Sequence, residues 1–266
     1  MMTVCREEFR MECLNGTDPV LVSDGIADWP ALQRWSPSFL AATVAHRPVD
    51  VFVSSTGSFS YTPDGGALDP ENQFVMQDRP FGDAAAAIVD ESASSPKYYI
   101  SQQDIALRLP ELLTDLRFPM RSEGTRLNLW FGSSGTVTQL HFDPRNNLYA
   151  QIYGSKRFTV FGPEETPYLY PFPQASLYAH FSYVDPEKPE PEHLPLLQRA
   201  RRITFTITAG QLLFLPAFWW HHVRSTGVSI SANQWWPPTR SQCCGPYGMR
   251  YLADPKAAVH ADTIRT

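Results

Sequence analysis

The stretch TVTQLHFDPRNN, Thr136 to Asn147, places a histidine and an aspartate two residues apart at the end of a segment that otherwise reads as a strand. Residues two apart on a β-strand project from the same face. His141 and Asp143 are therefore expected to point the same way, while Phe142 turns to the other face. The sequence thus predicts one polar pair on one wall of a β structure.

Around this stretch, from Arg126 onward, the chain reads as a series of short strands. Alternating apolar segments are separated by Gly, Pro, Asn and Asp, which is the pattern of strands joined by turns. The segments are RLNLWFG, VTQLHFD, NLYAQIY, KRFTVFG, RITFTIT, QLLFLP and VSISANQWW. Gly154-Ser155 and Ala209-Gly210 are expected to form tight hairpin turns. Many short strands of this kind predict a sandwich or barrel.

Residues 1–125 predict a mixed α and β front section. Its expected strands are the segment up to Val22 and PVDVFVSS. Its expected helices are Ser36–Ala45, PFGDAAAAIVDES with Asp83 as the N-cap, and QDIALRLPELLTDL. These elements are expected to pack on the barrel.

The rest of the chain completes a single predicted domain over residues 1–266. The segment 167–200 is too proline-rich for regular structure, so it is expected to be a surface excursion or a rim over a pocket. The barrel is expected at 126–238 and a tail at 239–266. The tail shows no long amphipathic helix, and the oligomeric state is left open.

Composition and charge narrow the class of protein. The 266 residues are 43% hydrophobic and 13% aromatic, which is typical of a globular protein. A net charge of -5 gives no general attraction to nucleic acid. The four cysteines show no CxxC spacing, so they predict free thiols. Without an apolar leader or span, the chain is expected to have no membrane contact and to be cytoplasmic, or nuclear in a eukaryote.

A second polar cluster lies in LPAFWWHHVRS, where His221 and His222 follow two tryptophans. An HxD pair with a distant histidine is the ligand set of the facial triad that holds Fe(II) and leaves positions open. The candidates are His141, Asp143 and one of the two adjacent histidines. The same set also binds Zn(II) or Mn(II), and an HxD pair alone also fits a capped turn or a surface position.

Lys156 opens the strand KRFTVFG in phase with Phe158 and Val160, while Arg157 is expected to face the other way. A lysine directed into a barrel needs an anion, because a buried unpaired ammonium is costly. The alternative interpretation is a solvated end of a hairpin.

The stretch from Asn128 to Pro171, followed by ITAGQLLFLPAFWWHHVRS and VSISANQWW, resembles the JmjC branch of the cupin-like Fe(II)- and 2-oxoglutarate-dependent oxygenases. It is similar in particular to the small JmjC-only hydroxylases. The resemblance covers about Pro19 to Pro238, since PVLVSDGIADWPALQRWS and YYISQQDIALRLPELLTDL match the front of that family. It implies a mainly β fold, a double-stranded β-helix (jelly-roll, cupin) barrel with flanking helices.

The resemblance also implies a set of site residues. It assigns His141, Asp143 and His221 to the metal and gives His222 at most an indirect bond. It puts the far carboxylate of 2-oxoglutarate on Lys156. The further contacts that it implies for this cosubstrate are Tyr99, Thr138, Asn147 and Asn233. The side chains expected to shape the pocket are Trp130, Tyr149, Trp235 and Trp236.

The implied activity is a dioxygenase reaction that uses Fe(II), 2-oxoglutarate and O2 and releases succinate and CO2. The substrate we expect is a C–H bond of a protein or peptide side chain. The alternatives are N-methyl demethylation, a modified tRNA base, a small molecule or natural product, and a cupin-like module that binds without turnover. Intact ligands and Lys156 argue against the binding module.

Overall fold

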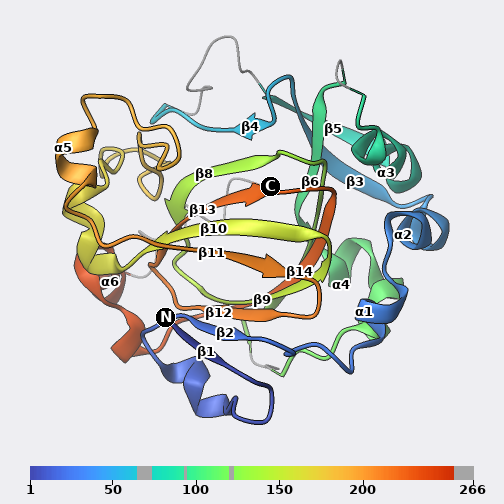
Figure 1. The fold of residues 1–266 in the computed structure, drawn as a ribbon, viewed down its shortest axis with the longest axis horizontal. Coiled ribbons are helices and arrows are strands. Elements are labelled where there is room, and N and C mark those ends of the chain that lie inside the picture. Colours follow the sequence, from blue (N-terminus) through green and yellow to red (C-terminus); the bar gives the residue numbers. More distant parts are fainter. Residues whose placement is uncertain (65–73, 93–94, 120–122, 255–266) are drawn as a thin grey trace.

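The computed structural model describes residues 1–64, 74–92, 95–119 and 123–254. Two β-sheets dominate this part of the chain (Figure 1). One is nine-stranded, in the order β1-β2-β12-β9-β14-β7-β6-β3-β5, and the other is five-stranded, in the order β11-β10-β13-β8-β4.

The strands from β7 onward form the predicted barrel by crossing between the two sheets. They are β7 (Arg126–Gly132), β8 (Val137–Phe142), β9 (Asn146–Tyr153), β10 (Ser155–Phe161), β11 (Ile203–Thr208), β12 (Leu212–Leu215), β13 (Trp220–Ser225) and β14 (Ser229–Trp236). Tyr149 and Leu213 from one sheet pack against Phe158 and Val160 from the other in a buried cluster. The two sheets therefore face each other, and the mainly β jelly-roll prediction is confirmed.

Strands of the front section extend the larger sheet at both edges. At one edge β6 (Lys97–Asp104) pairs with β7, and β3 (Pro48–Ser54) lies between β6 and β5 (Phe74–Pro80). At the other edge β2 (Val20–Val22) pairs with β12 and with β1 (Met2–Val4). The short strand β4 (Ser58–Phe59) lies parallel to β8 in the smaller sheet.

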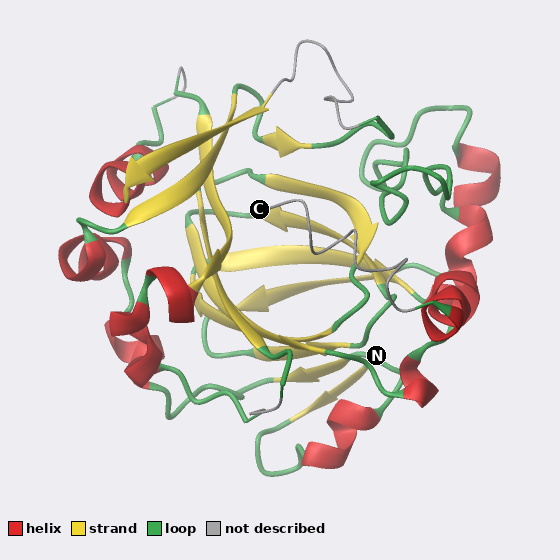
Figure 2. Ribbon diagram, turned by 180° about the vertical axis from the view of Figure 1, so that it is seen from behind, coloured by secondary structure: helices red, strands yellow, loops and turns green. Residues whose placement is uncertain are grey.

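Helices flank the sheets on both sides (Figure 2). A large buried cluster joins the outer face of the larger sheet to α1 (Pro30–Arg34), α2 (Pro37–Val44), α3 (Phe81–Val89) and α4 (Ile105–Arg108). At the opposite flank lie α5 (Leu194–Leu197) and α6 (Gly245–Ala253) (Figure 1). The 3₁₀ helices are Met11–Asn15, Pro110–Asp115, Pro163–Tyr168 and Arg240–Gln242.

Two predicted helices differ from the observed ones. Asp83 is not an N-cap, since α3 begins at Phe81, and the backbone carbonyls of Arg47 and Ala45 accept from the N–H groups of Phe81 and Gly82. The helix expected over 103–116 is broken after α4. Leu109 leaves the helical region because it precedes Pro110, and a 3₁₀ helix follows.

The two expected hairpins are corners between sheets. Strands β9 and β10, joined at Gly154, belong to different sheets, and so do β11 and β12, joined at Gly210. Both glycines have positive φ, 69° and 97°. The hairpin prediction was wrong because a turn signal marks where the chain reverses but not which strand it then pairs with.

Two smaller predictions can be compared directly. All four cysteines are free thiols, as expected. None of the described helices combines the length and the apolar character needed to cross a bilayer. In the C-terminal tail, residues 239–254 form a 3₁₀ turn and α6, and residues 255–266 lie outside the described residues.

Candidate metal centre and its pocket

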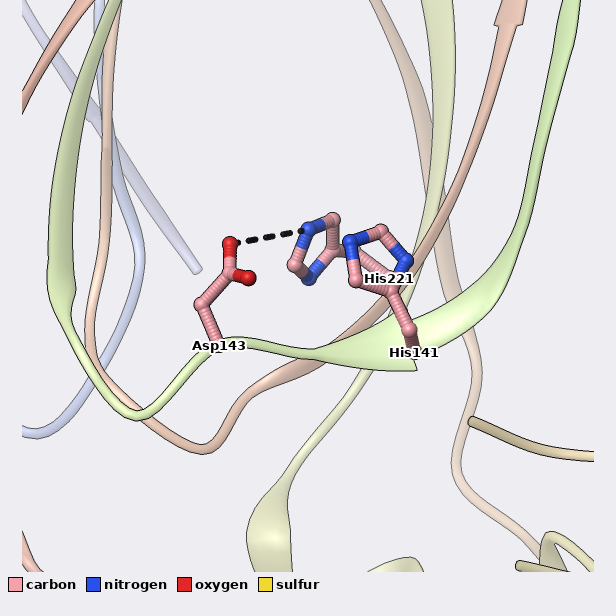
Figure 3. A group of neighbouring side chains, drawn as sticks. All are labelled: His141, Asp143 and His221. Atoms are coloured by element: carbon pink, nitrogen blue, oxygen red, sulfur yellow. Dashed lines mark ion pairs between the residues drawn. The ribbon is translucent and has the colours of Figure 1, made fainter. Parts of the chain in front are cut away.

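The centre is built where β8 and β13 lie side by side. His141 near the end of β8 is the direct register partner of His221 on β13, and their ring centroids are 4.1 Å apart. Asp143 follows β8 directly. One ligand atom from each of the three lies within 4.8 Å of the others, and Figure 3 shows the three side chains converging. The expected pair and one distant histidine therefore meet.

Backbone carbonyls orient both histidine rings. Nδ1 of His141 lies 2.7 Å from the carbonyl oxygen of Gln139, and Nδ1 of His221 lies 3.0 Å from that of Trp219. A carbonyl only accepts, so each Nδ1 carries the proton and each Nε2 keeps its lone pair. Nε2 of His221 is 3.7 Å from Oδ2 of Asp143. Both nitrogens that remain free are thus in the form that binds a metal.

Burial keeps these rings neutral. It lowers the pKa of His141 to about 4 and moves the pKa of His221 well below its usual value. In each case loss of hydration, which disfavours the charged imidazolium, is the main cause. A neutral imidazole is the form that binds a metal.

A bulge turns Thr138 toward the same pocket as His141. The two are three residues apart, so in a regular strand they would face opposite sides. In register, His141 pairs with His221 and Thr138 pairs with Val223, so β8 uses one residue more than β13 over this interval. The irregularity brings both side chains into the pocket lining.

Lys156 is buried in the same pocket, only 1% exposed. Its Nζ donates to the Tyr99 hydroxyl at 3.3 Å and lies 5.2 Å and 5.6 Å from the ring centres of Tyr99 and Tyr149. Within the described ranges it forms no ion pair with a carboxylate. Burial alone lowers the pKa of Lys156 to about 7. Arg157 faces outward and is exposed, as its place in the strand predicts.

Asn147 lines the pocket, whereas Asn233 stands behind it. Nδ2 of Asn233 donates to Oδ1 of Asn147 at 2.9 Å. Oδ1 of Asn233 accepts from Asn128 at 3.1 Å and from Trp130 at 3.0 Å. Since Oδ1 of Asn147 is already engaged, its amide N–H groups are free to face a ligand. Asn233 is absent from the pocket lining and orients the side chain of Asn147 through this hydrogen bond.

The pocket walls include residues that the sequence reasoning missed. Trp130, Tyr149 and Trp235 line it as expected, but Trp236 stacks on Phe214 in the outer cluster. Trp236 was assigned wrongly because adjacent strand residues face opposite sides. The missed lining residues include Phe52, Phe59, Tyr61, Arg145, His180 and Phe181. The last two come from the proline-rich segment, whose length was the signal available in the sequence.

His222 does not join the centre. It lies on the opposite face of β13 from His221, in a second group with Asp185 and Glu187. Among the described residues neither ring nitrogen of His222 has a hydrogen-bond partner, so the indirect bond to the site is not seen there. The reason is that successive strand residues alternate in direction.

Comparisons with known proteins agree with this geometry. The family described as "Cupin-like domain" matches residues 6–242. Jumonji C domain-containing protein 5 of Drosophila melanogaster is 30% identical over 239 residues, 86% of this chain and 57% of its own length. Lysine-specific demethylase 8 of Danio rerio is 33% identical over 241 residues, 86% of this chain and 56% of its own.

A further relative is bifunctional peptidase and (3S)-lysyl hydroxylase JMJD7 of Homo sapiens, 28% identical over 254 residues, 82% of this chain and 77% of its own length. This chain spans a little over half the length of the fly and zebrafish proteins. The family match covers most of the chain, and the barrel and the His-Asp-His group agree with it. The chain therefore belongs to the cupin-like domain family, within its JmjC branch.

Proposed function

We propose that this chain is an Fe(II)- and 2-oxoglutarate-dependent dioxygenase that hydroxylates a C–H bond of a protein or peptide side chain. The observation that carries the proposal is one pocket holding two sites. One is the group His141, Asp143 and His221, and the other is Lys156, a buried cation without a carboxylate partner among the described residues.

The donor set fits Fe(II). Two neutral imidazole nitrogens and one carboxylate make the facial arrangement that leaves coordination positions open. The backbone carbonyls of Gln139 and Trp219 fix both rings before a metal arrives, which lowers the cost of binding. When bound, Fe(II) with O2 supplies the oxidising chemistry that converts 2-oxoglutarate to succinate and CO2 and oxygenates the substrate.

The polar groups deeper in the pocket fit the cosubstrate. The Lys156 ammonium matches the far carboxylate of 2-oxoglutarate, and the Tyr99 hydroxyl already touches that ammonium. We assign Thr138 and the amide of Asn147 as further donors, with Asn233 orienting Asn147. An anion bound here also removes the cost of burying an unpaired ammonium.

The aromatic walls have a physical role in this proposal. Phe181 stacks against His141 at 5.2 Å, and Trp130 packs edge-on against Trp235 at 6.1 Å. Rings of this kind exclude water and hold a flat-sided cavity around the metal. A dry pocket strengthens the pairing of Lys156 with a carboxylate.

Two relatives support a protein substrate by their names, one a lysyl hydroxylase and one a lysine-specific demethylase. Demethylation is the second candidate, because a hydroxylated N-methyl group leaves as formaldehyde. A tRNA base or a small molecule is less favoured, given the net charge of -5 and these relatives. Mass spectrometry of reacted peptides distinguishes the two leading reactions, since one adds an oxygen atom and the other removes a methyl group.

The test is an anaerobic titration of the metal-free protein with Fe(II) and then 2-oxoglutarate. We expect the weak visible charge-transfer band of a chelated 2-oxo acid, followed by succinate release on admission of O2. Lys156→Ala should bind Fe(II) normally but need far more 2-oxoglutarate to give the band. A folded wild-type protein that binds Fe(II) and gives no band overturns the proposal and favours the module that binds without turnover.

A further inference from the structure

A second group of possible metal ligands lies on the outer face of the smaller sheet. His222 projects there from β13, and Asp185 and Glu187 reach it from the segment between β10 and β11. One ligand atom of each lies within 4.8 Å of the others. The group is separated from the first centre by the thickness of a strand, because His221 and His222 are adjacent and face opposite sides.

His222 is buried without a hydrogen bond. The residue is 1% exposed, and neither Nδ1 nor Nε2 has a partner among the described residues. A buried imidazole normally finds a hydrogen-bond partner for each ring nitrogen, since a buried polar atom that has lost its water and gained no partner is costly. Oε1 of Glu187 is also buried without a hydrogen bond. His222 and Glu187 therefore each bring an atom without a hydrogen bond to one small group of possible ligands.

The spacing of these atoms suits an ion better than a hydrogen bond. Nε2 of His222 is 3.7 Å from Oδ1 of Asp185, too long for a hydrogen bond. Two ligands each about 2.0–2.2 Å from a tetrahedral Zn²⁺ lie roughly 3.3–3.5 Å apart. At the first centre Nε2 of His221 and Oδ2 of Asp143 are separated by the same 3.7 Å.

Two arginines set the charge of the group. Nε of Arg224 binds Oε2 of Glu187 at 2.5 Å, which leaves Oε1 directed away from that contact. Nε of Arg157 is 3.7 Å from Oε1, on a side chain that is 49% exposed and has room to swing away. With two carboxylates and two guanidinium groups the surroundings are neutral. A cation there is bound less tightly than at a site without arginines, and the 43% exposed Asp185 gives it a path to solvent.

We propose that His222, Asp185 and Glu187 form a second divalent-cation site, selective for Zn²⁺ and similar late transition metals. One imidazole nitrogen and two carboxylate oxygens, with water in the open position, suit Zn²⁺. An all-oxygen set would suit Mg²⁺ or Ca²⁺ instead. The ion joins the barrel to the segment 162–202, which also supplies His180 and Phe181 to the pocket wall. Its role is to hold that wall in place.

The experiment measures Zn²⁺ binding to metal-free protein by competition with a chromophoric chelator. Wild type should bind two equivalents and Asp185→Asn one. In a His141→Ala/Asp143→Ala background, which removes two ligands of the first centre, one equivalent should remain. Adding Asp185→Asn to that background should weaken Zn²⁺ binding by roughly tenfold or more. Zn²⁺ should also raise the melting temperature of the background protein.

The matched control is Glu190→Gln, which removes one carboxylate from the same segment at an exposed position outside the group. Glu190→Gln should still bind two equivalents of Zn²⁺. His222→Phe, which fills the same space without a ligand atom, should bind one equivalent, as Asp185→Asn does. A single equivalent in wild type that Asp185→Asn leaves unchanged overturns the second site, whatever the fate of the first centre.

Discussion

Thr138 and His141 lie three residues apart on one strand and nevertheless face the same pocket. Their partners on β13, Val223 and His221, are only two residues apart, so β8 holds one extra residue over this interval. A regular strand would have sent the hydroxyl to the opposite side of the sheet. The bulge therefore adds a hydrogen-bonding group to the pocket without moving the HxD pair.

Thr138→Val tests that hydroxyl, since valine keeps the shape and removes the donor. We expect the KM for 2-oxoglutarate to rise roughly tenfold with little change in Fe(II) binding, because a hydrogen bond to a charged group is lost. Thr159→Val is the control, as Thr159 is also buried but lies outside the pocket lining, and its Oγ1 contacts that of Thr204 at 3.2 Å. An equal rise in both variants would assign the effect to packing.

Lys156→Met should stabilise the protein when no cosubstrate is present. Burial holds the pKa of Lys156 at about 7, whereas an unfolded lysine titrates near 10.5. Below pH 7 both states carry the proton and the folded state bears the full cost of the buried charge. Between pH 7 and 10.5 only the unfolded chain is protonated, so the free energy of unfolding of wild type rises with pH.

The gain from Lys156→Met is therefore greatest at or below pH 7, roughly 1–4 kcal/mol, and shrinks as the pH approaches 10.5. Urea unfolding of both proteins across this range measures the difference, in which other titrating groups cancel. Added 2-oxoglutarate should raise the melting temperature of wild type but not of the variant. A difference that stays constant with pH would show that Lys156 remains charged in the folded state.

Gly154→Ala should destabilise the corner between β9 and β10. The residue has a φ of 69°, and a Cβ there would lie 2.2 Å from the carbonyl oxygen of Val228. We expect a loss of roughly 2–4 kcal/mol in the free energy of unfolding, measured in urea. Gly135→Ala is the control, with a φ of 83° and no atom within 4 Å, and should cost about 1 kcal/mol. If both variants lost the same free energy of unfolding, the positive φ alone would explain the loss in Gly154→Ala and the close contact with Val228 would contribute nothing.

Asp143→Asn and Asp185→Asn make the same chemical change at equal distances, 3.7 Å, from a histidine Nε2. The first should weaken Fe(II) binding and lower turnover at least roughly a hundredfold, because a direct ligand is lost. The second should leave turnover within about threefold at saturating Fe(II). Succinate release measures both, and a large loss in Asp185→Asn alone would reverse the assignment of the two groups.

Local patterns in the sequence predicted the strands well. Alternation from Arg126 onward gave segments that correspond closely to β7 through β12 and β14, and the phase of Lys156 placed it inward. Strand β13 was missed as a separate element, because LPAFWWHHVRS reads as the end of the strand before it. Strand β12 ends before Pro216, and the separate strand β13 begins at Trp220.

The remaining features depend on partners far away in the chain. The turn at Gly154 has a local signal, but its being a corner between two sheets does not, since that depends on which strands lie alongside. The bulge beside Thr138 is likewise defined by the pairing of β8 with β13. The hydrogen bond from Asn233 to Asn147 joins residues 86 apart in sequence. The group around His222 likewise needs the segment 162–202 to fold back on the sheet. The roles of the ligand and cosubstrate residues stay predictions until they are measured.

Because His221 and His222 are adjacent on β13, the pairing register of that strand decides which histidine enters the pocket. A slip by one residue would replace His221 with His222 in the pocket, and a metal would still find an imidazole there. Trp220 prevents this, since its side chain is fully buried on the outer face and its Nε1 donates to Oγ1 of Thr166 at 2.9 Å. A slipped strand would turn this indole into the barrel. A tryptophan that is absent from the pocket lining thus decides which of two chemically identical neighbours faces the pocket.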